Sequence, residues 1–143
     1  MKTVANILAA KGSDVFAIAP GASVYDALQL LADKNVGALA VVDDSKLVGI
    51  VSERDYARKV VLVDRSSRDT LVSEIMSSDV KTVAPTASIE ECMELMTERH
   101  IRHLPVLEDD ELVGVVSIGD VVKAVIADLA AMVEQLDSYI RGR

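Results

Sequence analysis

Residues 47–55 read LVGIVSERD, and residues 112–120 read LVGVVSIGD, so one short pattern occurs twice, 65 positions apart (112 − 47 = 65). The same offset aligns residues 15–61 with residues 80–126 without a gap, and about a third of the aligned positions are identical. Two copies are too few for a solenoid, whose repeats stack in longer arrays. The repeat therefore predicts two halves packed about a pseudo-twofold axis, with equivalent residues of both halves around shared clefts.

Each copy has the pattern of a β-α-β-β-α unit. A short extended piece and a proline turn lead to Ser23 or Ser88, and a carboxylate follows three residues later. A hydroxyl at this position caps the first turn of a helix. The next apolar residues recur with helical spacing, and two apolar runs around an acidic turn are then typical of a β-hairpin. A second helix, beginning near Arg54 or Gly119, closes each copy.

The whole chain is predicted to be an α+β protein with two tandem repeats and helical extensions at both ends. We expect the first repeat, with an N-terminal helix, over residues 1–66 and the second over residues 67–126. Residues 127–143 continue as an amphipathic helix. Its apolar side either packs on the core or mediates self-association, and the sequence leaves both interpretations open.

Composition excludes several classes of protein. The 143 residues are 50% hydrophobic and carry a formal net charge of −8. Nucleic-acid binding needs a basic surface, so it is not expected. No apolar run has the roughly 20 residues of a membrane span, and no signal peptide is recognisable at the N-terminus. The single cysteine, Cys92, lies on a predicted buried stripe. We expect a cytoplasmic protein.

The repeated Gly-x-x-Ser-x-x-Asp pattern carries the candidate chemistry. In the first copy it places Gly49 at a strand, Ser52 at the start of a helix and Asp55 in the first helical turn. Free amides at a helix N-terminus favour a phosphate. A carboxylate beside them suits the hydroxyls of a sugar. The same Ser-x-x-Asp spacing is also an ordinary capping device, and two copies of a cap would look alike.

The doubled unit, with this pattern after each hairpin and His103-Leu104-Pro105-Val106 opening the second one, resembles the CBS domain pair, named after cystathionine β-synthase. The resemblance covers nearly the whole chain. It implies a disc-like module with two clefts that binds adenosine-containing ligands such as AMP, ADP, ATP, NAD(H) or S-adenosylmethionine. In such modules the serine contacts phosphate, the aspartate contacts ribose, and adenine lies between apolar side chains and strand backbone.

Carried over to this sequence, the resemblance implies three groups of ligand contacts. The groups are the ribose-binding Asp55 and Asp120; the phosphate-binding Ser52, Arg54, Ser117, Gly119, Arg102 and His103; and an adenine pocket of Thr82, Ile118, Leu104, Pro105 and Ala38. Because Arg102 and His103 precede a strand of the second repeat, we expect them to equip the cleft of Asp120. The cleft of Asp55 would then find its cations at Arg54 or Lys59.

The function expected from these observations is a regulatory module that senses an adenine nucleotide or dinucleotide. An enzyme would need a nucleophile, a general base or a metal, and no matched set occurs, so neither catalysis nor a bound metal is expected. The alternative is a structural module that dimerises and contacts protein, with degenerate clefts. We expect a homodimer and an unidentified protein target, and neither nucleic acid nor a membrane as a partner.

Overall fold

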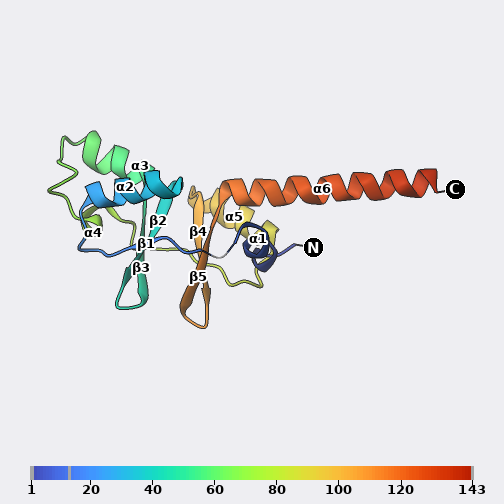
Figure 1. The fold of residues 1–143 in the computed structure, drawn as a ribbon, viewed down its shortest axis with the longest axis horizontal. Helices are drawn as coiled ribbons and strands as arrows, with labels where there is room; N and C mark the ends of the chain where they lie inside the picture. Colours follow the sequence, from blue (N-terminus) through green and yellow to red (C-terminus); the bar gives the residue numbers. More distant parts are fainter. Residues whose placement is uncertain (1, 13, 143) are drawn as a thin grey trace.

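The computed structural model describes residues 2–12 and 14–142. Two β-hairpins stand side by side with helices packed around them, and one long helix projects from the body (Figure 1). The elements are α1 (Val4–Lys11), β1 (Ala17–Ile18), α2 (Val24–Lys34), β2 (Ala38–Asp43), β3 (Lys46–Ser52), α3 (Glu53–Tyr56), η1 (Ala57–Val61), α4 (Val72–Ile75), α5 (Ile89–Arg99), β4 (His103–Glu108), β5 (Glu111–Ser117) and α6 (Ile118–Arg141).

The two hairpins have the same register. Ala38 pairs with Ser52 in β2–β3, and the equivalent His103 pairs with Ser117 in β4–β5. Each turn consists of two residues with positive φ, residues 44–45 and 109–110. Such turns match the right-handed twist of the strands, and aspartate and serine tolerate them because their side chains are short and polar. β1 adds a parallel strand to the first hairpin, whereas the equivalent segment of the second makes a single bridge, Val83 to Val106.

Serine caps begin the first helix of each repeat, as the sequence predicts. The Ser23 hydroxyl accepts from the amide of Asp26, and the Ser88 hydroxyl accepts from the amide of Glu91, both at 3.1 Å. Each helix ends on a residue in the left-handed region, Asn35 or His100. The two helices, α2 and α5, therefore have matching starts and ends, which places the segments that follow them at equivalent positions in the two halves.

The short helices α1 and α4 are exchanged between the repeats. Val4, Ile7 and Leu8 of α1 lie in the core of the second repeat, and Val72 and Ile75 of α4 lie in the core of the first. Each helix therefore precedes one repeat in the sequence and packs into the other. The apolar faces of both repeats are completed by this exchange, so burial of each core requires residues from both parts of the chain.

The two repeated glycines make room for these exchanged helices. A Cβ atom on Gly114 would lie 2.7 Å from Leu8 Cδ2, and one on Gly49 would lie 2.6 Å from Met76 Sδ and 2.9 Å from the carbonyl oxygen of Ser77. Real Cβ atoms do not approach other heavy atoms this closely. The glycine of the repeated pattern therefore allows another part of the chain to approach the strand closely.

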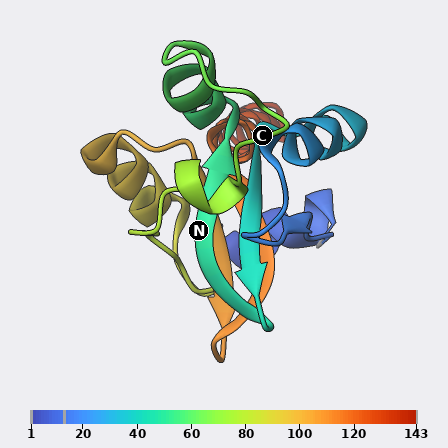
Figure 2. The ribbon, with the colours of Figure 1, turned by 90° about the vertical axis from the view of Figure 1, so that its left-hand side faces the viewer.

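The second helices of the two repeats differ in length and form. In the first repeat, α3 passes into the π-helical turn η1 and ends at Val61. In the second, α6 runs without interruption from Ile118 to Arg141, so residues 127–141 continue the closing helix of the repeat. Viewed end-on, α6 lies behind the packed helices and points away from them (Figure 2).

Candidate functional site

A cleft of about 630 Å³ lies between the two repeats. The first repeat contributes the start of β2, the end of β3 and the helical turns that follow, within residues 37–59. The second contributes the end of α5 and the start of β4, residues 99–103, and the connector contributes residues 77–81. A molecule bound in this cleft would contact both halves of the chain at once.

Positive charge is concentrated in this cleft although the protein as a whole is acidic. Six of the chain's 15 lysines and arginines line it, together with both histidines, whereas three of its 23 acidic residues do. The basic residues are Arg54, Arg58, Lys59, Lys81, Arg99, Arg102, His100 and His103. Because the six lysines and arginines outnumber the three acidic residues, the lining has an excess of positive charge that favours an anionic ligand.

Four of these cations are uncompensated. In the described part of the chain, no carboxylate forms an ion pair with Arg54, Arg58, Arg99 or Arg102. A guanidinium presents several N–H donors in a planar fork that matches the oxygens of phosphate. Four such groups around one cavity therefore form a set of donors suited to more than one phosphate oxygen.

Ser52 and Asp55 lie in this cleft and also cap α3. The Asp55 carboxylate accepts from the backbone amide of Ser52 at 2.9 Å and from its hydroxyl at 3.1 Å, and the same hydroxyl accepts from the amide of Asp55 at 3.2 Å. Lys59 Nζ lies 3.3 Å from the second carboxylate oxygen. The capping interpretation is thus confirmed. Because the carboxylate also lines the cleft, with 14% of the side chain exposed, it remains available to a ligand.

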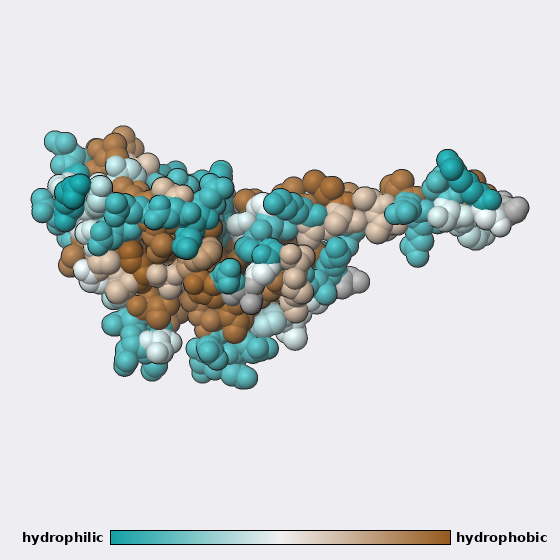
Figure 3. All heavy atoms as spheres, viewed as in Figure 1, coloured by the Kyte–Doolittle hydropathy of each residue, from teal (hydrophilic) through white to brown (hydrophobic). Residues whose placement is uncertain are grey.

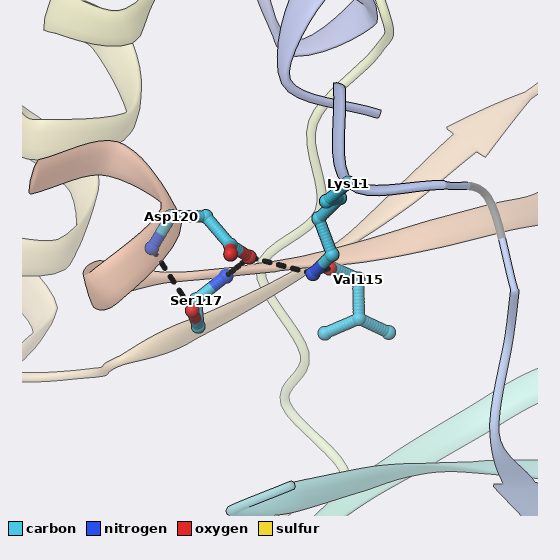
Figure 4. A network of polar contacts seen from close by, with 4 residues as sticks. All are labelled: Lys11, Val115, Ser117 and Asp120. Atoms are coloured by element: carbon cyan, nitrogen blue, oxygen red, sulfur yellow. Dashed lines mark hydrogen bonds and ion pairs between the residues drawn. The ribbon is translucent and has the colours of Figure 1, made fainter. Parts of the chain in front are cut away.

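Ser117 and Asp120 make the equivalent cap in the second repeat, but Lys11 covers them. Figure 4 shows Lys11 reaching from the end of α1, its Nζ 2.6 Å from Asp120 and 2.9 Å from the carbonyl oxygen of Val115. Burial favours a raised pKa at Asp120, but hydrogen bonds from Lys11 and Ser117 outweigh burial and hold the pKa below its ordinary value. Asp120 and Ser117 are not among the residues that line the 630 Å³ cleft.

Arg102 and His103 line the cleft of Asp55, although the sequence predicts them beside Asp120. The reason is that the packing of the two halves sets the start of β4 against the segment before β2. A Cβ atom on Gly37 would lie 3.4 Å from His103 Nε2. His103 also lies near enough to Asp120 for the charge of that carboxylate to act on its pKa. Burial lowers the pKa of His103, against the opposing charge of Asp120, so the imidazole is mostly neutral near pH 7.

The other predicted contacts are dispersed. Ala38 and Arg54 line the cleft. Leu104 and Pro105 are buried in β4, whereas Thr82 is exposed and Ile118 is 45% exposed. Neither these four residues nor Gly119 lines the cleft. Their contact with a ligand stays a prediction.

Sequence reasoning missed several cleft residues. Ser77, Asp79 and Lys81 come from the connector between the aligned repeats and the start of the second one. Arg58 lies in η1 and Arg99 is the last residue of α5, and neither belongs to a motif. Lys11 precedes the aligned repeat altogether. A count of cations near helix ends would have found Arg99, but no local signal places Lys11 on Asp120.

The fold and the cleft define a small doubled α+β module suited to an anionic small molecule. The model of the CBS domain family matches residues 7–62 and 72–127. The chain therefore belongs to the CBS domain family, and the predicted tandem fold is confirmed. A solved CBS-domain protein from Burkholderia ambifaria is 55% identical, with a TM-score of 0.86 over 89% of this chain and 96% of that chain.

Two curated relatives have different lengths. The mitochondrial CBS domain-containing protein CBSX3 of Arabidopsis thaliana is 44% identical over 125 residues, which cover 84% of this chain and 61% of that protein. The protein YhcV of Bacillus subtilis is 34% identical over 108 residues, 76% of both chains. The match thus spans less than two thirds of the Arabidopsis protein.

One structural neighbour was solved with ligands. The CBS domain pair of protein MJ0100, in complex with 5′-methylthioadenosine and S-adenosyl-L-methionine, is 25% identical, with a TM-score of 0.78 over 90% of this chain and 98% of that chain. CBS pairs are regulatory modules, and some bind adenosine-type ligands. Within residues 2–12 and 14–142, no helix is both long and apolar enough to cross a membrane, and no cluster of metal-binding side chains occurs.

Removing the Lys11 amine should destabilise the fold in a pH-dependent way. We expect Lys11→Met to cost about 1 kcal/mol at pH 7, because the pair with Asp120 is only partly shielded from solvent. The pKa of Asp120 is lowered by folding, so this contribution is complete above the unfolded pKa, about 3.9, and disappears as pH falls through the folded value. Urea unfolding at pH 7, 5 and 3 measures the difference between variant and wild type.

Lys2→Met is the matched control, because Lys2 makes a looser and more exposed pair with Asp128 at 3.6 Å. We expect it to change stability by less than about 0.5 kcal/mol. If Lys11→Met behaves like this control at every pH, then Lys11 does not hold Asp120 in solution.

Proposed function

We propose that this chain is a non-enzymatic regulatory module that senses an adenosine-containing nucleotide, such as AMP, ADP, ATP or NAD(H), in the cleft of Asp55. The concentration of six lysines and arginines in one cleft of a protein with net charge −8 is the observation that carries this proposal. The charge selects an anion, and the cleft between the two CBS repeats supplies a volume of about 630 Å³.

The site offers a distinct partner for each part of such a ligand. The arginines suit phosphate oxygens. The carboxylate of Asp55 accepts three short contacts, to Ser52 N, Ser52 Oγ and Lys59 Nζ, and a carboxylate has about four acceptor sites, which leaves room for a ribose hydroxyl. Apolar lining for a base comes from Ala38, Ile50, Val80 and Ile101.

The same lining favours phosphate-bearing ligands over S-adenosylmethionine. The sulfonium of S-adenosylmethionine is positive, and in this cleft it would meet unpaired arginines. We therefore expect this chain to bind the ligands of MJ0100 more weakly than AMP or ATP, although all of these molecules contain an adenosine part. We expect affinity to rise with the number of phosphates, because each one adds charge that the four arginines can meet.

A regulatory role follows from where the ligand would sit. It would touch both repeats and the connector, so it would favour whichever arrangement of the halves brings these contacts together. The described residues show no activated nucleophile: Cys92 is fully buried, and burial raises the pKa of its thiol. A homodimeric state, an unidentified protein target and a cytoplasmic location belong to the same proposal.

A panel of ligands tests the proposal. We expect AMP, ADP, ATP, NAD and NADH to raise the melting temperature, and adenosine and S-adenosylmethionine to have little effect. Asp55→Asn should weaken binding of the best ligand at least about tenfold, since it removes the charge opposite ribose while keeping an oxygen that can cap α3. Asp43→Asn, on an exposed hairpin residue, makes the same change of charge away from the cleft and should bind like wild type.

The alternative is a structural interaction module with degenerate clefts, and the exposed apolar side of α6 is the observation that favours it. This alternative gains if no ligand of the panel shifts the melting temperature of the wild-type chain. Stabilisation that is equal in wild type and Asp55→Asn would place binding elsewhere in the molecule and overturn the assignment of the cleft.

A further inference from the structure

The final part of α6 leaves the body of the protein. Val121 and Ala124 are buried, but every described residue from 129 onward is exposed, so about half of the helix is open to solvent. Figure 1 shows this segment projecting alone, and Figure 3 shows brown, apolar side chains along one edge of it. Residues 129–141 continue this packed helix and expose large apolar side chains, which is typical of a surface that packs against a partner.

Apart from Ile118, Met132 and Tyr139, the exposed large apolar residues of α6 follow a regular pattern. They recur at alternating intervals of four and three residues, which is the 3.5-residue period of a coiled-coil seam. β-branched residues occupy one set of positions and mainly leucine the other, a combination typical of two-stranded coiled coils. The seam consists of Val122, Ile126, Leu129, Val133, Leu136 and Ile140, which are 49–66% exposed.

This seam points away from the residues that hold α6 on the body. Val121, Ala124, Val125 and Asp128 form the side of α6 that packs inward or pairs with the body, whereas the seam lies about a quarter to a third of a turn around the helix. A second helix can therefore occupy the seam along its length without displacing the repeat. The seam is open from Val122, beside the body, to Ile140 near the end of the helix.

We propose that the occupant of the α6 seam is the α6 seam of a second copy of this chain, which makes the protein a dimer through a two-stranded coiled coil. If six side chains on each helix bury on the order of 100 Å² each, the pair buries about 1,200 Å² in all, the lower end of the range for stable interfaces. Because both helices have the same 3.5-residue spacing, each seam side chain of one helix can pack against seam side chains of the other. The inference does not depend on what the cleft binds.

A membrane surface is the other occupant that an amphipathic helix could have, and the charges on α6 argue against it. The exposed polar residues of the projecting segment include Glu134 and Asp137, and Asp137 is paired with Arg141. Helices that lie on membranes carry lysine and arginine on the polar side, because the lipid surface is negative. A negatively charged lipid surface repels an acidic polar side. The same acidic side does not oppose pairing of the apolar seam with a second seam.

Sedimentation equilibrium of the full chain at micromolar concentrations tests the proposal. We expect wild type to have twice the 15.3 kDa mass of one chain. Leu129→Lys with Leu136→Lys should weaken dimerisation at least about a hundredfold, because two charges enter the seam of each helix. The control is Ala131→Lys with Ser138→Lys, which adds the same charges at the same seven-residue spacing on the opposite side of α6 and should leave the dimer intact.

A second variant separates loss of pairing from loss of the helix. Leu129→Ala with Leu136→Ala keeps high helix propensity and removes only apolar surface, so it should also shift the chain toward monomer while far-UV circular dichroism stays close to wild type. A monomeric wild type, or a dimer that survives both leucine variants, would overturn the proposal. So would a monomeric wild type that co-sediments with phosphatidylcholine/phosphatidylserine vesicles, which would assign the seam to a membrane.

Discussion

Ile75→Ala is expected to lower the free energy of unfolding by about 2–5 kcal/mol, the usual cost of emptying a large buried aliphatic site. Ile75 is 1% exposed and lies on α4, whose residues Val72 and Ile75 pack into the core of the first repeat. A loss of this size is a large part of the roughly 5–15 kcal/mol that holds a small domain folded. Urea unfolding followed by far-UV circular dichroism measures it.

The location of Ile75 makes this result informative. Residue 75 falls within residues 67–126, the part of the chain assigned to the second repeat from the sequence. If α4 were not packed in a core, its truncation would open no cavity and would cost little. Leu62→Ala is the control, because Leu62 is 77% exposed and its truncation should change stability by less than about 0.5 kcal/mol. A change below about 1 kcal/mol for Ile75→Ala would contradict the burial of α4 on which the exchange depends.

Arg102→Glu is expected to abolish stabilisation by the best nucleotide of the panel. Wild type at a hundredfold excess of ligand over Kd gains about 2.7 kcal/mol. Reversing the charge of a guanidinium that faces phosphate should raise Kd at least about a hundredfold, which leaves a gain of about 0.4 kcal/mol or less. The measurement is the shift of the urea midpoint with and without nucleotide.

The Arg102→Glu variant should otherwise fold like wild type. The Arg102 side chain is exposed and, within the described chain, makes no ion pair that the change would break. Lys46→Glu reverses a charge at the exposed first residue of β3 and changes the net charge equally, so it controls for long-range electrostatics. If the nucleotide stabilises Arg102→Glu as much as wild type, the phosphates do not contact the arginines of the cleft.

The repeated elements could be predicted from the sequence because their signals are local. Serine caps, apolar periodicity and acidic turns each act within about ten residues, and the structure has helices and hairpins at the predicted places. The exchange of α1 and α4 could not be predicted in this way. An amphipathic stretch such as Val4–Leu8 reveals which side it buries, but not which of two similar cores receives it.

The candidate site was only partly predictable for the same reason. Ser52, Asp55 and Arg54 belong to one local motif and were found together. Sequence alignment assigns Arg102 and His103 to their own repeat and so predicts them beside Asp120, whereas the cleft that they line forms between the repeats and includes Asp55. No local pattern marks Lys11. The equivalent position before the second repeat is residue 79 (11 + 68 = 79), which is an aspartate, so the repeat does not single out a lysine here.

The reciprocal placement of α1 and α4 also limits how this chain can be dissected. A fragment cut within residues 62–71 would give an N-terminal piece that carries a helix it cannot use and lacks the one that its own interior needs. The C-terminal piece would have the mirror-image deficiency. Neither piece is an autonomous building block for fusion to another protein, but mixing the two should restore a folded complex by complementation.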